Sequence, residues 1–182
     1  MNTEKEIINY VKNDDIYILG EFDNTISENI IALMPQIIGI KSNIRNSEIN
    51  IYINSPGGCT DILFSLTYFI EKAKQCGICV NTHVIGDAFS AGSYLAVQGS
   101  HRYMNRYSTQ LLHFGNVTTN AQTIKQLERN QKMINEHFNN LVDIYSKYTK
   151  LTKAQIKQFM SDDNCYLNAE ECLKYGLIDE IV

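Results

Sequence analysis

The sequence lacks any long run of one charge and any long run of apolar residues. Its 182 residues include 16 Lys and Arg against 20 Asp and Glu, so the net charge is −4. A chain without a concentrated basic patch is not expected to bind nucleic acid. Two long stretches without charge, 76–86 and 88–100, contain Asn, Thr, His and Ser. A membrane-spanning helix needs about 20 mostly apolar residues, so we expect no membrane span.

Signatures of several other protein classes are also missing. Residues 1–15 mix acidic and basic side chains and contain no apolar core of a secretory signal, so we expect a cytoplasmic protein. The sequence contains no phosphate-binding loop of the nucleotide hydrolases. It shows no linker or repeat, and its length predicts one domain over residues 1–182.

The five cysteines do not suggest a disulfide framework, because an odd number cannot all pair. Cys76 and Cys79 have the spacing of a redox pair or of half a zinc site. A thioredoxin-type pair lies where a strand enters a helix, whereas here a predicted helix ends and a strand begins. We therefore interpret these cysteines as incidental and expect neither a metal nor a cofactor.

Alternating helical and strand patterns predict an α/β fold. Isoleucines alternate with polar residues over 49–53, helical spacing follows over 62–73, and a β-rich run covers 78–85. Two shorter strands are expected near 101–104 and 109–114. Strands that alternate with helices indicate a parallel sheet with right-handed crossovers.

Helix signals mark several boundaries. The pair Thr25 and Glu28 resembles a capping box at the start of a helix, which Pro35 is expected to kink or end. Similar boxes at 152–155 and 168–171 predict two short helices, and Gly176 predicts the end of the second.

One long helix is predicted over about 120–148. At 1.5 Å per residue it would approach about 40 Å, more than the diameter of a small domain. Its apolar stripe therefore needs a partner beyond its own core, which indicates an oligomer.

Ser90 and His113 are the candidates for nucleophile and base. Ser90 lies between Ala and Gly where a strand pattern meets a helix pattern, so its hydroxyl can project from a tight turn. His113 follows an expected strand, a rigid support typical of a catalytic base. We expect His83 to be packed or at a sheet edge, and His101 and His137 to be solvated.

Gly57 and Gly58 follow another strand. Two glycines allow a close backbone approach and N–H groups directed at a developing oxyanion. An ordinary turn is the alternative.

Taken together, four strings in this order resemble the ClpP family of Clp protease proteolytic subunits. They cover residues 52–58, 86–92, 111–113 and 175–181, and the resemblance runs from about 16 to 182.

The resemblance implies a crotonase-like fold of repeated β-β-α units and a serine peptidase in two stacked seven-membered rings. Ser90 matches the nucleophile position and His113 the general base, and the N–H groups of Gly57 and Ala91 match the oxyanion hole. The helix over about 118–149 matches the handle that interlocks the rings. Segments after Gly57 and His113 would pair with an extended peptide.

Partners implied by the resemblance are peptides and unfolded proteins, delivered by an AAA+ unfoldase. A paralogous subunit is a further ring partner that the resemblance implies. Residues 1–15 leave little room for the axial loop through which the family contacts the unfoldase. A plastid or host-cell location is compatible with the resemblance as well as a bacterial cytoplasm.

Departures from the family lie at two places. The triad acid of the family aligns with Asn164, and Asp162 and Asp163 lie beside it, so a shift of one residue would restore a carboxylate. The stretch 114–119 replaces a glycine-rich segment of the family.

Two other functions follow from these observations. A ClpR-like ring subunit with little or no activity is favoured by Asn164 and opposed by Ser90 and His113. A crotonase-like acyl-coenzyme A enzyme would need carboxylate bases, and no clear pair is present.

Overall fold

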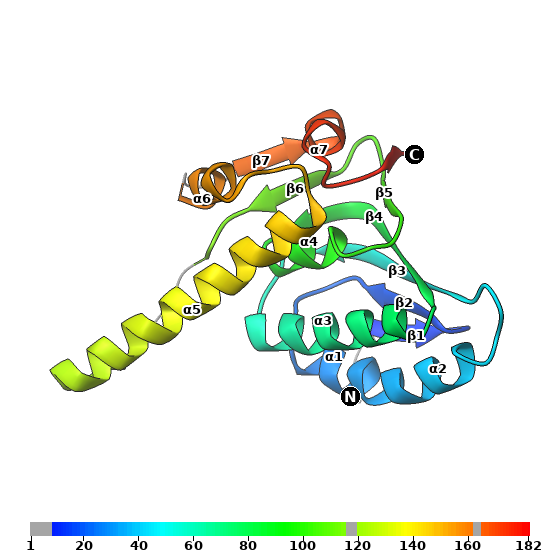
Figure 1. The fold of residues 1–182 in the computed structure, drawn as a ribbon, viewed down its shortest axis with the longest axis horizontal. Coiled ribbons are helices and arrows are strands. Elements are labelled where there is room, and N and C mark those ends of the chain that lie inside the picture. Colours follow the sequence, from blue (N-terminus) through cyan, green and yellow to red (C-terminus); the bar gives the residue numbers. More distant parts are fainter. Residues whose placement is uncertain (1–8, 116–119, 162–164) are drawn as a thin grey trace, which may run out of the picture.

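The fold combines one large sheet with helices on one side of it (Figure 1). The computed structural model describes residues 9–115, 120–161 and 165–182. The strands are β1 (Asn9–Lys12), β2 (Asp15–Ile18), β3 (Glu48–Ser55), β4 (Cys79–Phe89), β5 (Arg102–Met104), β6 (Thr109–Leu112), β7 (Cys165–Asn168) and β8 (Glu180–Ile181). The helices are α1 (Asn24–Asn29), a 3-10 turn (Ile31–Leu33), α2 (Met34–Lys41), α3 (Thr60–Gln75), α4 (Ala91–Ala96), α5 (Ile124–Tyr148), α6 (Lys153–Ser161) and α7 (Ala169–Tyr175).

The sheet is parallel along the series β2, β3, β4, β5 and β8, as the alternation of patterns predicted. β1 adds an antiparallel edge to β2, and β7 pairs antiparallel with β6. β4 is long enough to pair twice: Thr82–Val84 pair with β5, whereas Ala88 and Phe89 pair with β6. The end of β4, which still pairs with β3 through Ala88 and Ser55, therefore also carries the branch of the sheet formed by β6 and β7.

The two faces of the sheet differ. In β3, Ile49, Ile51 and Ile53 are at most 1% exposed and belong to the same core as the apolar side of α3. Rings on the other face form one stacked row across five strands, with centroids 4.7–4.9 Å apart. The row consists of Tyr10, Tyr17, Tyr52, His83 and Tyr103. Because the side chains of a strand alternate between faces, the isoleucine pattern of β3 also places Tyr52 on the face of this row.

The prediction for the first helix was wrong in its details. Asp23, and not Thr25, is the N-cap of α1, because its carboxylate accepts the Thr25 N–H at 2.9 Å. The helix ends at Asn29 and continues through a 3-10 turn into α2, where Pro35 occupies the first turn. Proline fits there because the first N–H groups of a helix have no partner within the helix.

The last helix confirms its predicted boundaries. Asn168 and Glu171 form a complete capping box, and Gly176 ends α7 with φ 72°. Arg102 of β5 then fixes this segment, since its guanidinium donates to the carbonyl of Gly176 and to the carboxylate of Asp179. These hydrogen bonds hold the pKa of Asp179 below its ordinary value.

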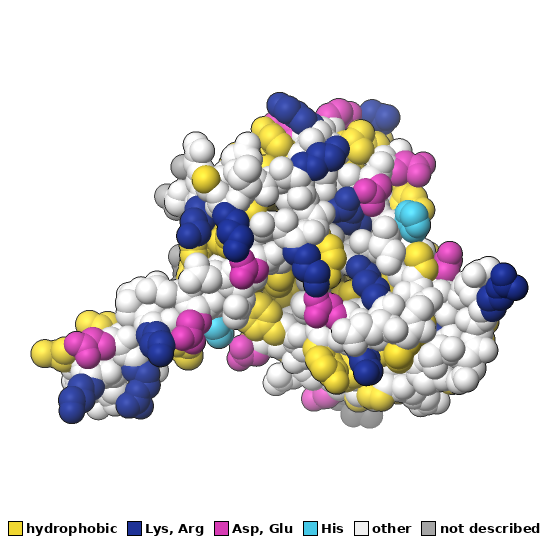
Figure 2. Space-filling view, in the orientation of Figure 1, with side chains coloured by type: hydrophobic (Ala, Val, Ile, Leu, Met, Phe, Trp, Pro, Cys, Tyr) yellow, Lys and Arg dark blue, Asp and Glu magenta, His cyan; other side chains and the backbone are white. Residues whose placement is uncertain are grey.

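The long helix α5 begins at Ile124, later than predicted, and ends at Tyr148 as predicted. Its C-terminal half packs on the body through Leu141, Val142 and Tyr145, whereas its N-terminal half projects from it (Figure 1). Ile124 is 78% exposed, and Figure 2 shows hydrophobic side chains at the projecting end. Among the described helices none is both long and apolar enough to cross a membrane.

Candidate active site

Ser90 lies in the turn between β4 and α4. Its backbone has φ 52° and ψ −120°, a strained conformation for a residue with a side chain. Its N–H donates to the carbonyl of Leu111 in β6 at 3.1 Å, and its carbonyl accepts the first hydrogen bonds of α4. These bonds fix the turn on both sides. Its place between a strand and a helix is the one that the sequence pattern around Ser90 predicted.

Gly57 makes the closest backbone approach to this turn. A Cβ atom at Gly57 would lie 2.6 Å from Ser90 Cβ and 2.7 Å from the carbonyl oxygen of Phe89, and the φ of Gly57 is 98°. Only glycine both lacks a Cβ atom and adopts this φ without strain. The position of Ser90 therefore determines the residue type at position 57.

The N–H of Gly57 has a partner inside the protein. It donates to Ser55 Oγ at 3.1 Å, and Ser55 in turn donates to the carbonyl of Gly20 at 2.6 Å. Serine side chains commonly bond backbone groups two residues away, and the sequence Ser-Pro-Gly-Gly carried that signal. The structure therefore disagrees with the prediction that Gly57 directs its N–H into the cleft.

Gly58 lies on the cleft wall instead; the sequence pattern included both glycines, and only the family resemblance selected Gly57. Phe22 pairs with this segment by donating to the carbonyl of Gly57 and accepting from the N–H of Cys59. In such a parallel bridge the groups of the middle residue point away from the partner. The N–H of Gly58 consequently points away from Phe22.

Ala91 supplies a second backbone donor beside Ser90. It is the first residue of α4, so its N–H is one of those without an acceptor within the helix. The Cβ position built at Gly57 lies 3.1 Å from Ala91 N, so the two predicted backbone segments are adjacent.

His113 follows the last residue of β6 and lines the same cleft as Ser90. Burial lowers the pKa of His113 below its ordinary value, so the ring is neutral at pH 7 and can accept a proton. Both side chains are described, and the structure has no hydrogen bond between Ser90 Oγ and the imidazole. Such contacts are commonly long in unliganded enzymes and shorten when substrate binds.

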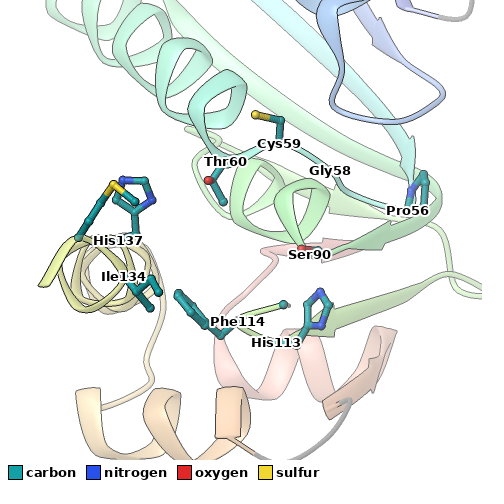
Figure 3. A pocket seen from close by; sticks show the side chains of 11 residues that line it. Pro56, Gly58, Cys59, Thr60, Ser90, His113, Phe114, Ile134 and His137 are labelled. Carbon is teal, nitrogen blue, oxygen red and sulfur yellow. The ribbon is translucent and has the colours of Figure 1, made fainter. Parts of the chain in front are cut away.

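The cleft that joins these residues has a volume of about 490 Å³. Figure 3 shows Ser90 and His113 near one another, with Ile134 and His137 of α5 across the cleft. His137 packs edge-on against Phe64 at 5.6 Å between centroids. The prediction of a merely solvated His137 was therefore wrong, because α5 lies against the start of α3.

His83 and His101 lie away from the cleft. His83 is stacked between Tyr52 and Tyr103 within the sheet, which confirms a packed position, and His101 is exposed. Asn164, together with Asp162 and Asp163, falls outside the described residues.

The described residues contain no cluster of three or more His, Cys, Asp or Glu side chains that could hold a metal ion. Cys76 caps the C-terminus of α3 and Cys79 begins β4, which confirms where the sequence placed this pair. Neither thiol lies at a helix N-terminus, the position that activates a thiol.

Comparison with known proteins matches the chain to one protein family. The family model described as Clp protease matches residues 2–182. The chain is 28% identical over 180 residues to the ATP-dependent Clp protease proteolytic subunit 4 of Rhodococcus jostii, covering 97% of this chain and 89% of that protein. It is 31% identical over 153 residues to the ATP-dependent Clp protease proteolytic subunit of Deinococcus radiodurans, covering 83% and 72% respectively.

Proposed function

The chain belongs to the Clp protease family, and on this premise we propose that it is a serine endopeptidase subunit in which Ser90 is the nucleophile and His113 the general base. One observation carries the proposal: Ser90, held in a strained turn, shares a cleft with a half-buried histidine whose pKa is lowered. A serine needs such a neutral base, because its hydroxyl is a weak nucleophile at neutral pH.

The reaction proceeds in two steps. His113 accepts the hydroxyl proton while Ser90 Oγ attacks the carbonyl carbon of the scissile peptide bond. The imidazolium then gives that proton to the leaving amine, and an acyl-enzyme remains on Ser90. A water molecule, deprotonated by the same imidazole, hydrolyses the ester and restores the serine.

The oxyanion of the tetrahedral intermediate is stabilised by backbone N–H groups. Ala91 supplies one donor beside Ser90. Gly57 was the predicted second donor, but Gly58 is favoured, because the N–H of Gly57 bonds Ser55 whereas Gly58 lines the cleft. Such donors lower the energy of the transition state more than that of the substrate.

Asn164 is the proposed third member of the triad. Antiparallel pairing of β6 and β7 joins Leu112 to Cys165, the neighbours of His113 and Asn164 along the chain. An amide oxygen can accept the imidazole N–H, but it carries no charge to stabilise the imidazolium, so we propose low intrinsic activity. Asp163 is the alternative.

The proposed substrates are extended peptides and unfolded proteins. The segments after Gly57 and His113 border the cleft, and backbone pairing with them would make cleavage depend little on side chains. We propose that an AAA+ unfoldase delivers proteins, so that ATP is used by that partner.

We propose an assembly of two stacked heptameric rings in the cytoplasm, with a paralogous subunit as a possible ring partner. The projecting half of α5 supports an oligomer, because Ile124 and Leu127 are 78% and 56% exposed. Large apolar side chains on a projecting helix are stabilised when another subunit covers them.

A second candidate function is a ClpR-like structural subunit. Asn164 favours it, since the triad then lacks a charged member. Cleavage of an unstructured fluorogenic peptide by the purified protein separates the two. We expect slow cleavage that Ser90→Ala abolishes and that Ser65→Ala, at an exposed position of α3, leaves unchanged. Equal residual cleavage by Ser90→Ala and the wild type would overturn the peptidase assignment.

A further inference from the structure

Tyr94 connects the nucleophile to the base. Its N–H donates to the carbonyl of Ser90 at 3.1 Å, one turn earlier in α4. Its phenol hydroxyl donates to the carbonyl oxygen of His113, also at 3.1 Å. A single residue, 1% exposed, therefore contacts the main chain at both reacting positions, through its own main chain at Ser90 and through its side chain at His113.

His113 needs such a contact because of its place in the fold. β6 ends at Leu112, so His113 is the first residue beyond the ladder that pairs β6 with β4 and β7. Displacement of this main chain moves the imidazole, and small displacements of a catalytic group from its productive geometry slow a reaction.

The ring of Tyr94 is itself held from α5. It packs against the ring of Tyr145 with centroids 4.5 Å apart, and Tyr145 is fully buried. Ser93 donates to Gln110 Oε1 at 2.8 Å, and its oxygen lies 2.7 Å from the hydroxyl of Tyr145. Ser93 has one hydroxyl proton, so Tyr145 is the donor in the second bond.

Both phenols remain protonated, since burial raises the pKa of Tyr94 and that of Tyr145. Each can therefore act as a hydrogen-bond donor at neutral pH. Only the protonated phenol can donate to the carbonyl of His113, because a carbonyl oxygen accepts and does not donate.

We propose that Tyr94 is a positioning residue, which sets the location of His113 relative to Ser90 through its phenol hydroxyl. The kinetic part of this inference rests on the proposed peptidase function. The structural part concerns only the environment of the imidazole, so it can be tested even if the protein does not cleave peptides.

The test compares Tyr94→Phe with Tyr145→Phe. Each change removes one buried hydroxyl and keeps the ring, but only the first removes a hydrogen bond to His113. Loss of one hydrogen bond predicts a roughly tenfold lower kcat for Tyr94→Phe at nearly unchanged KM. Because the freed segment admits water, the pKa of His113 should rise towards its ordinary value, which moves the acid limb of kcat/KM to higher pH.

NMR titration of protein labelled with carbon-13 at histidine Cε1 measures the same pKa without substrate. A His113→Gln variant assigns the signal. Among the described residues, the other titratable groups that line the cleft are Cys59 and His137; Tyr94 contacts the main chain of His113, and Cys165 pairs with the neighbouring Leu112. None of them is altered in Tyr145→Phe, which should keep the wild-type His113 titration while its thermal stability falls.

The two proposals fail in different ways. If the wild type cleaves no peptide but Tyr94→Phe shifts the His113 titration, the positioning role stands and the peptidase assignment falls. If Tyr94→Phe keeps the wild-type kcat and His113 titration and resembles Tyr145→Phe in its stability alone, the hydroxyl is only structural and the inference is overturned.

Discussion

The Cα of Gly57 is so near Ser90 that a Cβ atom at position 57 would lie 2.6 Å from the Cβ of Ser90. Two chain segments about thirty residues apart are thereby held at contact distance. The strained turn of Ser90 and the left-handed conformation of Gly57 depend on one another, because neither segment can move without losing this approach.

Gly57→Ala should therefore lower both stability and activity. A residue forced into such a backbone region costs about 1–3 kcal/mol, and the overlap with Ser90 and Phe89 adds to that. Chemical denaturation measures the change in the free energy of unfolding. Gly39→Ala is the matched control, because nothing lies within 4 Å of a Cβ atom there and alanine favours the helix α2. A Gly57→Ala variant as stable as Gly39→Ala would contradict the close approach.

Giving the proposed third triad member, Asn164, a charged side chain should increase activity. In a Ser-His-Asp triad the change of Asp to Asn lowers turnover by about 10⁴-fold. Asn164→Asp should accordingly raise kcat for a short peptide, by up to that factor, because a carboxylate stabilises the imidazolium. Asp163→Asn is the companion variant and should leave kcat unchanged. The reverse pattern would assign the third position to Asp163.

Acid should destabilise the protein through His83. Burial lowers the pKa of His83 in the folded protein, whereas in the unfolded chain it has its ordinary value near 6.5. As the pH falls below about 6.5, the unfolded chain binds a proton at His83 that the folded protein does not yet bind. The free energy of unfolding therefore decreases. This loss ends below the folded pKa, where both states are protonated.

His83→Phe keeps a ring in the stacked row and removes the titrating group. The free energy of unfolding of this variant should therefore depend less on pH below the ordinary pKa of histidine. Denaturation midpoints between pH 7.5 and 5 measure the difference. His101→Phe changes an exposed histidine and serves as the control. Identical pH profiles for the wild type and His83→Phe would exclude this role of His83.

The projecting half of α5 should control assembly. Leu127→Glu places a charge on an apolar side chain that is 56% exposed, so it should weaken the association of subunits with little effect on the fold. Native mass spectrometry should then show smaller assemblies than the wild type forms. Lys125→Gln, on the same turn, should assemble normally. Unchanged assembly of Leu127→Glu would place the interface elsewhere.

Local signals predicted much of this fold. The capping box at Asn168 and Glu171 acts within one turn, and the stop at Gly176 depends on its own backbone angle, so both could be read from the sequence. The start of α1 was placed wrongly because Asp23, two residues before Thr25, competes for the same N–H groups. The residue types alone do not show which of two neighbouring capping residues begins the helix.

The site could be predicted only where its residues are positioned by their neighbours along the chain. Ser90 and His113 follow strands, which strand patterns locate, and the structure places both on one cleft. The buried cluster of Ser93, Gln110 and Tyr145 joins residues 17 and 52 positions apart. The place of His137 on the cleft wall likewise depends on the packing of α5 against α3, which no local pattern contains.

The central claim is that Ser90 is an activated nucleophile in an assembled ring. Labelling of the native protein with a fluorophosphonate, followed by native mass spectrometry and peptide mapping, tests it most directly, since such probes react with activated serines. We predict a multimeric assembly that carries the label on Ser90, and loss of the label in His113→Gln. An assembled wild-type protein that carries no label on Ser90 would contradict the account and favour the structural subunit.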